Sequence, residues 1–202
     1  MIDNYFRARL PIYLEPIVRL LKRGRIHPHW LTLGGLVLAT ASTVLIAYDH
    51  LLAALLLWWI GRACDCLDGL LARASGKTTA LGSYLDIVCD MAAYSAVILG
   101  FWWRNPEFAG QGLLILFFYV LCITSALALG MQEQGLKLPP RDNRGLRLGA
   151  GLAEGGETSL MYSAFCLFPM QLDVLANLWM LLLLITVLSR TLHASRVLKM
   201  ER

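Results

Sequence analysis

Four aspartates stand at regular intervals near the middle of the chain, in segments that are otherwise rich in apolar residues. They are Asp65, Asp68, Asp86 and Asp90, named here the carboxylate cluster. On a helix, the first two would lie about 60° apart and the last two about 40° apart, so each pair shares a face. If the two faces meet, the four carboxylates cannot all be ionised without counter-charge. Carboxylate oxygens suit the hard cations Mg²⁺ and Mn²⁺, and two such ions would balance the four charges. The spacing therefore predicts a two-metal site of the kind that promotes displacement at phosphorus.

The composition places this cluster in a membrane protein. Of the 202 residues, 57% are hydrophobic and 16% are charged, against about 45–50% and about 25% in soluble domains. The apolar residues form long blocks, each near the roughly 20 residues that cross a bilayer. These features exclude a soluble monomer. A secreted disulfide scaffold is also excluded, because the five cysteines are odd in number and lie in or beside apolar segments.

The predicted fold is all-α, with six transmembrane helices preceded by an amphipathic helix at the membrane interface. A single domain is expected over residues 1–202, with a juxtamembrane segment at 1–29, the six-span bundle at 30–192 and a cytoplasmic tail at 193–202. Apolar residues recur at helical spacing between residues 10 and 21, which predicts a bent helix on the cytoplasmic leaflet. A disordered basic leader is the alternative. The six spans are expected at Trp30–Tyr48, Leu51–Arg73, Gly82–Trp103, Gly112–Leu129, Leu152–Met170 and Leu172–Leu192.

The basic residues predict the orientation of this bundle. Seventeen of the 18 Lys and Arg residues fall on one side of the six-span arrangement, and only Arg104 falls on the other. By the positive-inside rule, both termini and the carboxylate cluster face the cytoplasm. Residues 1–29 lack the apolar region of a cleavable signal peptide. We therefore expect an integral membrane protein whose active site faces the cytoplasm.

The residues around the aspartates form a longer pattern. It reads Asp65-x-x-Asp68-Gly69-x-x-Ala72-Arg73, then eight residues, then Gly82-x-x-x-Asp86-x-x-x-Asp90. This pattern resembles the signature of the CDP-alcohol phosphatidyltransferase family of membrane enzymes and matches it at every fixed position. The chain length and the six predicted spans are also similar to those of the small bacterial members, which implies a bacterial inner membrane.

The resemblance implies a reaction and a set of site residues. The enzyme would transfer a phosphatidyl group from CDP-diacylglycerol to the hydroxyl of a small alcohol and release CMP, as a step of phospholipid biosynthesis. The four aspartates would be ligands of two Mg²⁺ or Mn²⁺ ions, and Asp90 would also be the catalytic base for the acceptor hydroxyl. Gly69, Arg73 and Thr79 would contact the CDP-lipid. No nucleic-acid partner is expected, and a homodimer is an open alternative to a monomer.

The acceptor alcohol is left open by the sequence. A basic loop could bind the phosphate of glycerol 3-phosphate or inositol phosphate, or its charge could reflect topology alone. Its basic residues are Lys137, Arg141, Arg144 and Arg147. Glu154 and Glu157 share a helical face and are expected to edge the same cavity. These acids would favour acceptor hydroxyls or an ammonium over a phosphate, unless they pair with Arg144 or Arg147.

Other protein classes explain less of the pattern. An intramembrane prenyltransferase that acts on a lipid diphosphate needs two separated Asp-rich motifs, and a divalent-metal transporter gives no reason for Gly69 and Arg73. An intramembrane aspartyl protease needs only two aspartates. Simple pairing of polar helix ends with Arg62, Arg73 and Lys77 would account for single aspartates but not for four. His29 stands where many family members carry Asn, and its role is left open.

Overall fold

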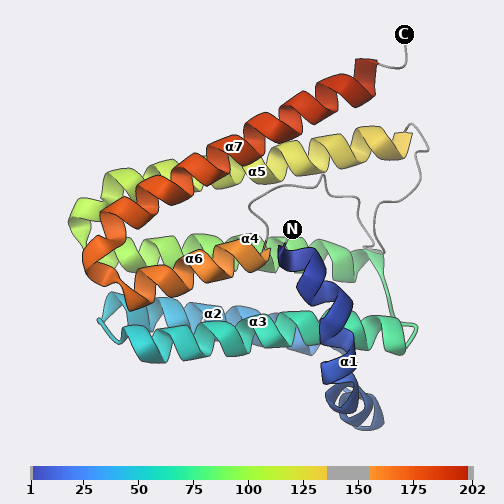
Figure 1. Cartoon of the computed structure of the whole chain (residues 1–202). Coiled ribbons are helices and arrows are strands. Elements are labelled where there is room, and N and C mark those ends of the chain that lie inside the picture. The colour runs from blue at the N-terminus through green and yellow to red at the C-terminus, as the bar shows by residue number, and fades with distance from the viewer. Residues whose placement is uncertain (1, 136–154, 200–202) are drawn as a thin grey trace.

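The computed structural model describes residues 2–135 and 155–199, and every regular element within these ranges is a helix (Figure 1). The all-α prediction is therefore confirmed for these residues. Two short 3₁₀ helices, η1 (Pro106–Phe108) and η2 (Pro169–Gln171), precede the helices that begin at Ala109 and Leu172. The α-helices are α1 (Ile2–Arg23), α2 (Pro28–Ala47), α3 (Leu51–Ala74), α4 (Ala80–Arg104), α5 (Ala109–Gly135), α6 (Gly155–Leu167) and α7 (Leu172–Lys199).

Four of these helical segments are long and apolar enough to cross a membrane. They are Pro28–Ala47, Ala80–Arg104, Pro106–Gly135 and Pro169–Leu198. Helix α3 has sufficient length, 24 residues, but its apolar first part is followed by Arg62, Asp65 and Asp68. Helix α6 has 13 residues and is shorter than a span. The structure thus supports an integral membrane protein in which α3 and α6 differ from the other long helices in charge and in length.

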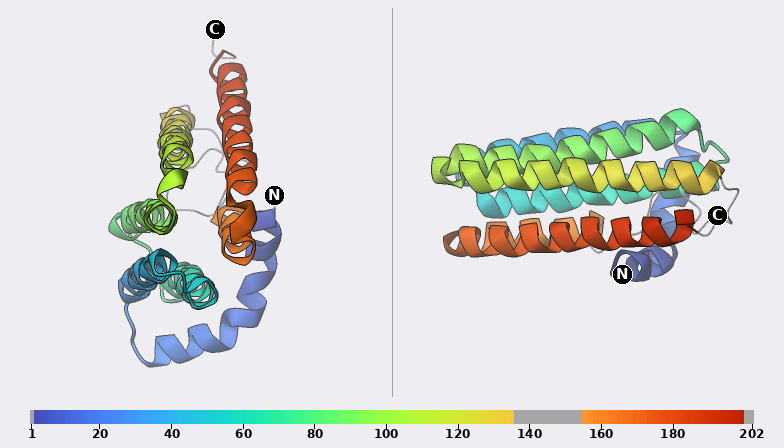
Figure 2. Two further views of the ribbon diagram at one scale, coloured as in Figure 1. Left: turned by 90° about the vertical axis from the view of Figure 1, so that its left-hand side faces the viewer. Right: turned by 90° about the horizontal axis from the view of Figure 1, so that it is seen from above.

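The six helices from α2 to α7 run side by side in three layers of two (Figures 1 and 2). Helices α2 and α3 form one outer layer, α4 and α6 the middle layer, and α5 and α7 the other outer layer. Helix α2 packs against both α3 and α4, and α5 packs against α7. Because α3 and α4 share α2 as a neighbour, their polar ends are held at the same end of the bundle.

Small residues let these helices approach closely. A Cβ atom at Gly35 of α2 would lie 3.1 Å from the carbonyl oxygen of Gly61 in α3, and a Cβ atom at Gly61 would lie equally close to that of Gly35. On the other side, a Cβ atom at Gly100 of α4 would lie 2.8 Å from the carbonyl oxygen of Thr43. Close backbone contact through small residues is the usual means by which membrane helices pack.

A hydrogen-bonded aromatic network joins the layers in the core. The indole Nε1 of Trp179 in α7 donates to the hydroxyl of Tyr119 in α5 at 2.9 Å, and the hydroxyls of Tyr119 and Tyr162 lie 2.7 Å apart. The Tyr162 hydroxyl of α6 then donates to the carbonyl oxygen of Tyr94 in α4 at 2.8 Å. Since buried hydroxyls need partners, this network fixes the middle layer of α4 and α6 relative to the outer layer of α5 and α7.

Helix α1 crosses one end of the bundle with a marked bend (Figure 2). The Nζ atom of Lys22 donates to the carbonyl oxygen of Ala74, at the end of α3, at 2.7 Å. Val18 is buried, whereas Tyr13, Ile17 and Leu20 on a neighbouring face are exposed. The helix therefore presents one apolar stripe to the protein and leaves a second one outside it.

Candidate metal and substrate site

Three carboxylates converge where the cytoplasm-facing ends of α3 and α4 are predicted. Oxygen atoms of Asp65 and Asp68 from α3 and of Asp86 from α4 all lie within 4.8 Å of one another. Asp68 is buried, Asp65 is half-buried and Asp86 is exposed. The two polar helix faces therefore meet as the spacing predicts, and the group opens toward solvent on the side of Asp86.

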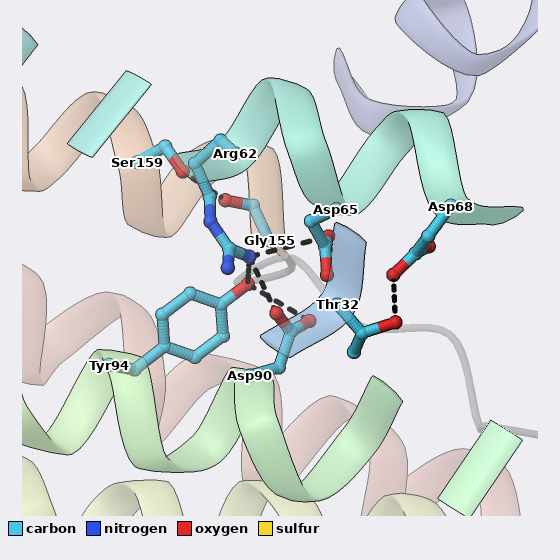
Figure 3. Close-up of polar contacts among 8 residues, drawn as sticks. All are labelled: Thr32, Arg62, Asp65, Asp68, Asp90, Tyr94, Gly155 and Ser159. Atoms are coloured by element: carbon cyan, nitrogen blue, oxygen red, sulfur yellow. Dashed lines mark hydrogen bonds and ion pairs between the residues drawn. The ribbon is translucent and has the colours of Figure 1, made fainter. Parts of the chain in front are cut away.

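Asp90 lies one turn further along α4 and has a different set of partners (Figure 3). Its Oδ1 atom accepts a hydrogen bond from Nη1 of Arg62 at 2.5 Å. The same nitrogen lies 3.4 Å from Oδ2 of Asp65 and 3.3 Å from the hydroxyl of Tyr94. The Tyr94 hydroxyl also lies 3.3 Å from Oδ2 of Asp90. Arg62 therefore links Asp90 on α4 to Asp65 on α3.

Arg62 is enclosed by aromatic rings. Its guanidinium carbon lies 5.1 Å from the ring centre of Trp58 and 5.4 Å from that of Tyr94, within the range of cation–π attraction. The sequence suggested Arg62 only as a partner in simple pairing of helix ends, and that pairing is observed for Asp65 and Asp90. The signal for the second pair was weak, because Arg62 and Asp90 are 28 positions apart and lie on different helices.

Thr32 of α2 completes the surroundings of Asp68. Its buried hydroxyl donates a short hydrogen bond to Oδ2 of Asp68. Sequence reasoning missed this contact. A threonine in an apolar helix usually bonds its own backbone, so its type and position gave no indication that it would reach α3.

The residues predicted to contact the CDP-lipid lie at the same end of the bundle. The exposed Arg73 folds back over Gly69, where a Cβ atom would lie 3.3 Å from Arg73 Nη1. Thr79 caps the start of α4, and its hydroxyl oxygen accepts a hydrogen bond from the Gly82 backbone at 3.0 Å. His29 reaches this point from α2, because a Cβ atom at Gly82 would lie 3.3 Å from its Cε1 atom.

Most of the predicted acceptor residues lie outside the described part of the chain. They are Lys137, Arg141, Arg144, Arg147 and Glu154. Glu157 is described and lies half-buried in the first turn of α6. The start of that helix abuts the site, since a Cβ atom at Gly155 would lie 2.9 Å from the Tyr94 hydroxyl. The beginning of α6 therefore lies next to the Tyr94 hydroxyl, which contacts Asp90.

The chemistry of the donor set fits a hard divalent cation. Three carboxylates within 4.8 Å repel one another unless a cation lies among them. Carboxylate oxygens are the ligands that Mg²⁺ and Mn²⁺ prefer. The guanidinium of Arg73 on the same helix offers the planar donors that match phosphate oxygens. The arrangement can therefore hold a metal ion next to a phosphate-containing ligand.

Comparisons with known proteins agree with this chemistry. A family model described as CDP-alcohol phosphatidyltransferase matches residues 25–192. An inner membrane protein of Escherichia coli, YnjF, is 34% identical over 172 residues, which cover 84% of this chain and 83% of that protein. The phosphatidylinositol phosphate synthase of Mycobacteroides abscessus is 29% identical over 193 residues, covering 90% of this chain and 83% of the relative.

A solved structure is similar over most of the chain. The phosphatidylinositol phosphate synthase of Mycobacterium tuberculosis with CDP-DAG bound superposes with a TM-score of 0.68 at 25% identity, covering 89% of this chain and 91% of that one. The same enzyme in complex with manganese and citrate gives the same TM-score, identity and share of this chain, and 87% of its own chain is covered.

Proposed function

The chain belongs to the CDP-alcohol phosphatidyltransferase family, and we propose that its carboxylate cluster is the active site for phosphatidyl transfer. The enzyme transfers a phosphatidyl group from a CDP-linked lipid to the hydroxyl of an alcohol and releases CMP, as a step of phospholipid biosynthesis. The observation that carries the assignment of the site is the convergence of Asp65, Asp68 and Asp86 between α3 and α4.

The four aspartates are proposed to hold two Mg²⁺ or Mn²⁺ ions. Bound divalent ions neutralise charge on phosphate oxygens and on the entering and leaving oxygens of a displacement. Asp68 is held by Thr32 and lies beside Gly69 on the helix that carries Arg73. This placement supports a role for Asp68 and Arg73 on the donor side, with Gly69, which lies under the Arg73 guanidinium, and Thr79 beside the nucleotide.

Asp90 is proposed to take the proton of the acceptor hydroxyl. The acceptor oxygen forms a bond to the phosphatidyl phosphorus, the bond from that phosphorus to the bridging oxygen breaks, and CMP leaves with that oxygen. The proton moves to the Asp90 carboxylate. Arg62 Nη1 donates to Oδ1 of this carboxylate at 2.5 Å, and the Tyr94 hydroxyl donates to its Oδ2 atom at 3.3 Å. These contacts orient the Asp90 carboxylate before the second ion and the acceptor bind.

A phosphorylated small alcohol is the proposed acceptor class. Two relatives are named phosphatidylinositol phosphate synthases, which supports inositol phosphate, and glycerol 3-phosphate offers the same charged group. The basic residues Lys137, Arg141, Arg144 and Arg147 are proposed to bind that phosphate, and Glu154 and Glu157 to edge the pocket. The position of α6 beside Tyr94 supports the placement of Glu157.

The membrane arrangement is proposed to include all six helices from α2 to α7 as spans. Helix α3 packs against α2 and α6, and its charged residues Arg62 and Asp68 are buried against protein rather than exposed to lipid. Helix α1 is proposed to lie at the interface, with Tyr13, Ile17 and Leu20 in the lipid. The excess of basic residues at the site end supports a cytoplasmic active site, and the E. coli relative supports an inner membrane.

The test is the reaction itself. Purified protein is incubated with CDP-diacylglycerol, Mn²⁺ or Mg²⁺ and one acceptor at a time, and CMP release is followed. We expect release with inositol phosphate or glycerol 3-phosphate, little release with inositol, serine or no acceptor, and none with EDTA. Absence of CMP with every acceptor, together with metal uptake into liposomes, would favour a transporter. Light scattering of the same preparation distinguishes a monomer from a homodimer.

A further inference from the structure

Arg62 occupies a position in the carboxylate cluster that a cation would otherwise fill. Its Nη1 atom contacts Asp90 at 2.5 Å, Asp65 at 3.4 Å and the Tyr94 hydroxyl at 3.3 Å (Figure 3). Only 10% of its side chain is exposed. An ion pair at that depth is screened far less than one on the protein surface. The positive charge of the guanidinium therefore partly neutralises Asp65 and Asp90, two of the four aspartates.

The surrounding helices fix this guanidinium in place. Trp58, one turn earlier on α3, and Tyr94 on α4 place their rings 5.1 and 5.4 Å from it. Gly155 of α6 closes against the Tyr94 hydroxyl from the other side. The Nε atom of Arg62 is buried and has no hydrogen-bond partner among the described residues. Keeping a charged group here costs desolvation energy, which indicates that its charge is used.

The other three carboxylates form a set that does not include Asp90. Oxygens of Asp65, Asp68 and Asp86 lie within 4.8 Å of one another, so one divalent ion can be held there while Arg62 keeps its contact with Asp90. A second ion that uses Asp90 must displace either Arg62 Nη1 from the Oδ1 atom or the Tyr94 hydroxyl from the Oδ2 atom. It must also approach a fixed positive charge, which repels it.

We propose that Arg62 is a built-in cation that competes with a divalent ion for Asp90, so that the two metal positions fill in order and with unequal affinity. This inference rests on the metal site of the proposed function. Arg62 acts as a positioning residue, because it holds Asp90 in place until the second ion arrives. The ion held by Asp65, Asp68 and Asp86 binds first, and the ion at Asp90 binds second.

The experiment is a Mn²⁺ titration of the purified protein in detergent, with free Mn²⁺ measured by its electron paramagnetic resonance signal. We expect wild-type protein to show one tight and one weaker ion. Arg62→Met removes the charge but keeps a similar length, so the weaker ion should tighten by about 10- to 100-fold, the equivalent of one hydrogen bond between charged groups. The tight ion should change less. Arg62→Lys keeps the charge and should keep the unequal binding.

A matched control removes an arginine from an equally close ion pair away from the cluster. Arg104 Nε lies 2.6 Å from Asp49 Oδ1 at the opposite end of the bundle, and Arg104→Met should leave both Mn²⁺ affinities unchanged. Asp90→Asn provides a second test, since it should abolish the weaker ion and keep the tight one. That variant identifies the weaker ion as the one that uses Asp90, and Arg62→Gln, which also removes the charge, takes the place of Arg62→Met if the latter does not fold.

Several outcomes would overturn the inference. These are two ions of equal affinity in the wild type, no Mn²⁺ binding, loss of the tight ion in Asp90→Asn, or unchanged affinities in a folded Arg62→Met protein. The proposed function and the role of Arg62 are contradicted by different results. Ordered Mn²⁺ binding without CMP release would count against the reaction alone, and CMP release with two equal ions would count against the role of Arg62 alone.

Discussion

Asp68 and Asp90 have the same side chain, but their neighbouring residues differ and favour different roles in the reaction. Asp68 is buried, accepts a hydrogen bond from Thr32 and precedes Gly69 on the helix that carries Arg73. Asp90 lies on α4, and its carboxylate is held by a cation and by the Tyr94 hydroxyl. The first arrangement suits a ligand that fixes metal and donor, and the second suits a base that receives a proton.

Amide replacements should separate the two roles. Asp68→Asn should weaken both Mn²⁺ binding and CDP-diacylglycerol binding, because a neutral amide is a poorer metal ligand. Asp90→Asn should leave donor binding largely intact while the rate of CMP release falls by about 10²–10⁴, the usual range for loss of a general base. A larger fall is expected if the weaker metal ion is also lost. Donor affinity by calorimetry and the rate of CMP release are measured on each variant.

The exposed Asp173, in the first turn of α7, provides the control. Asp173→Asn should change neither donor affinity nor rate. If Asp90→Asn abolishes donor binding as fully as Asp68→Asn while metal still binds, the assignment of Asp90 as the base is wrong.

At this scale the sequence predicts contacts within a helix better than contacts between helices. The pairing of Asp65 with Asp68 follows from helical periodicity alone, because residues three apart always share a face. The contacts of Thr32 with Asp68 and of Arg62 with Asp90 depend on how two helices are rotated against each other. No local pattern records that rotation, so both contacts required the structure.

The elements hold the cluster together through close packing on α2. Gly35 and Gly61 bring α3 onto this helix, and Gly100 brings α4 onto it from the other side. A side chain at any of these glycines would meet backbone rather than a flexible side chain. The spacing between the two Asp-bearing helices therefore depends on glycines both beside the cluster, at Gly35 and Gly61, and ten residues beyond Asp90, at Gly100.

Replacement of Gly100 tests this dependence. A Cβ atom there would lie 2.8 Å from the Thr43 carbonyl oxygen, so Gly100→Ala must push α4 away from α2. Overpacking of this kind costs about 1–3 kcal/mol, which exceeds the gain of about 0.5–1 kcal/mol for Ala over Gly in a helix. We expect a lower midpoint of thermal unfolding in detergent. The control is Gly34→Ala on α2, where the added atom meets nothing within 4 Å and the midpoint should stay or rise.

An unfolding midpoint for Gly100→Ala at or above that of Gly34→Ala would show that α2 and α4 are not held by this contact. The two variants make the same chemical change in helices of the same bundle. Their difference therefore reports the contact and not the intrinsic preference of alanine for helix.

The helix positions themselves were largely predictable, and their ends were less so. Apolar blocks gave the middle of every helix from α2 to α7, because a run of about 20 apolar residues has few alternatives. Helix α7 continues to Lys199, beyond the predicted end at Leu192, since its last two turns are polar and need no lipid. Helix α1 begins at Ile2 and passes through Pro11 and Pro16, so it starts earlier than the apolar spacing indicated.

The whole molecule is electrically asymmetric along its long axis. The end with the carboxylate cluster also carries Lys22, Arg73 and Lys77, whereas the opposite end holds Arg104, whose charge is paired with Asp49. Basic residues near the ends of spans are retained on the cytoplasmic side. A cytoplasmic active site would also meet CDP-lipids and small phosphorylated alcohols on the side where they are expected.

Labelling of single cysteines should determine this orientation. The exposed Lys77 lies in the turn between α3 and α4, and the exposed Glu107 lies in η1 at the opposite end. In a variant without the five native cysteines, a membrane-impermeant maleimide applied to intact cells should label Glu107→Cys and leave Lys77→Cys unlabelled. Both should react after permeabilisation, which controls for accessibility of the thiols.

Labelling of Lys77→Cys from outside would show the opposite orientation of the bundle, because the basic end and the active site would then face away from the cytoplasm. Labelling of both positions in intact cells would contradict an arrangement in which α4 crosses the membrane between them.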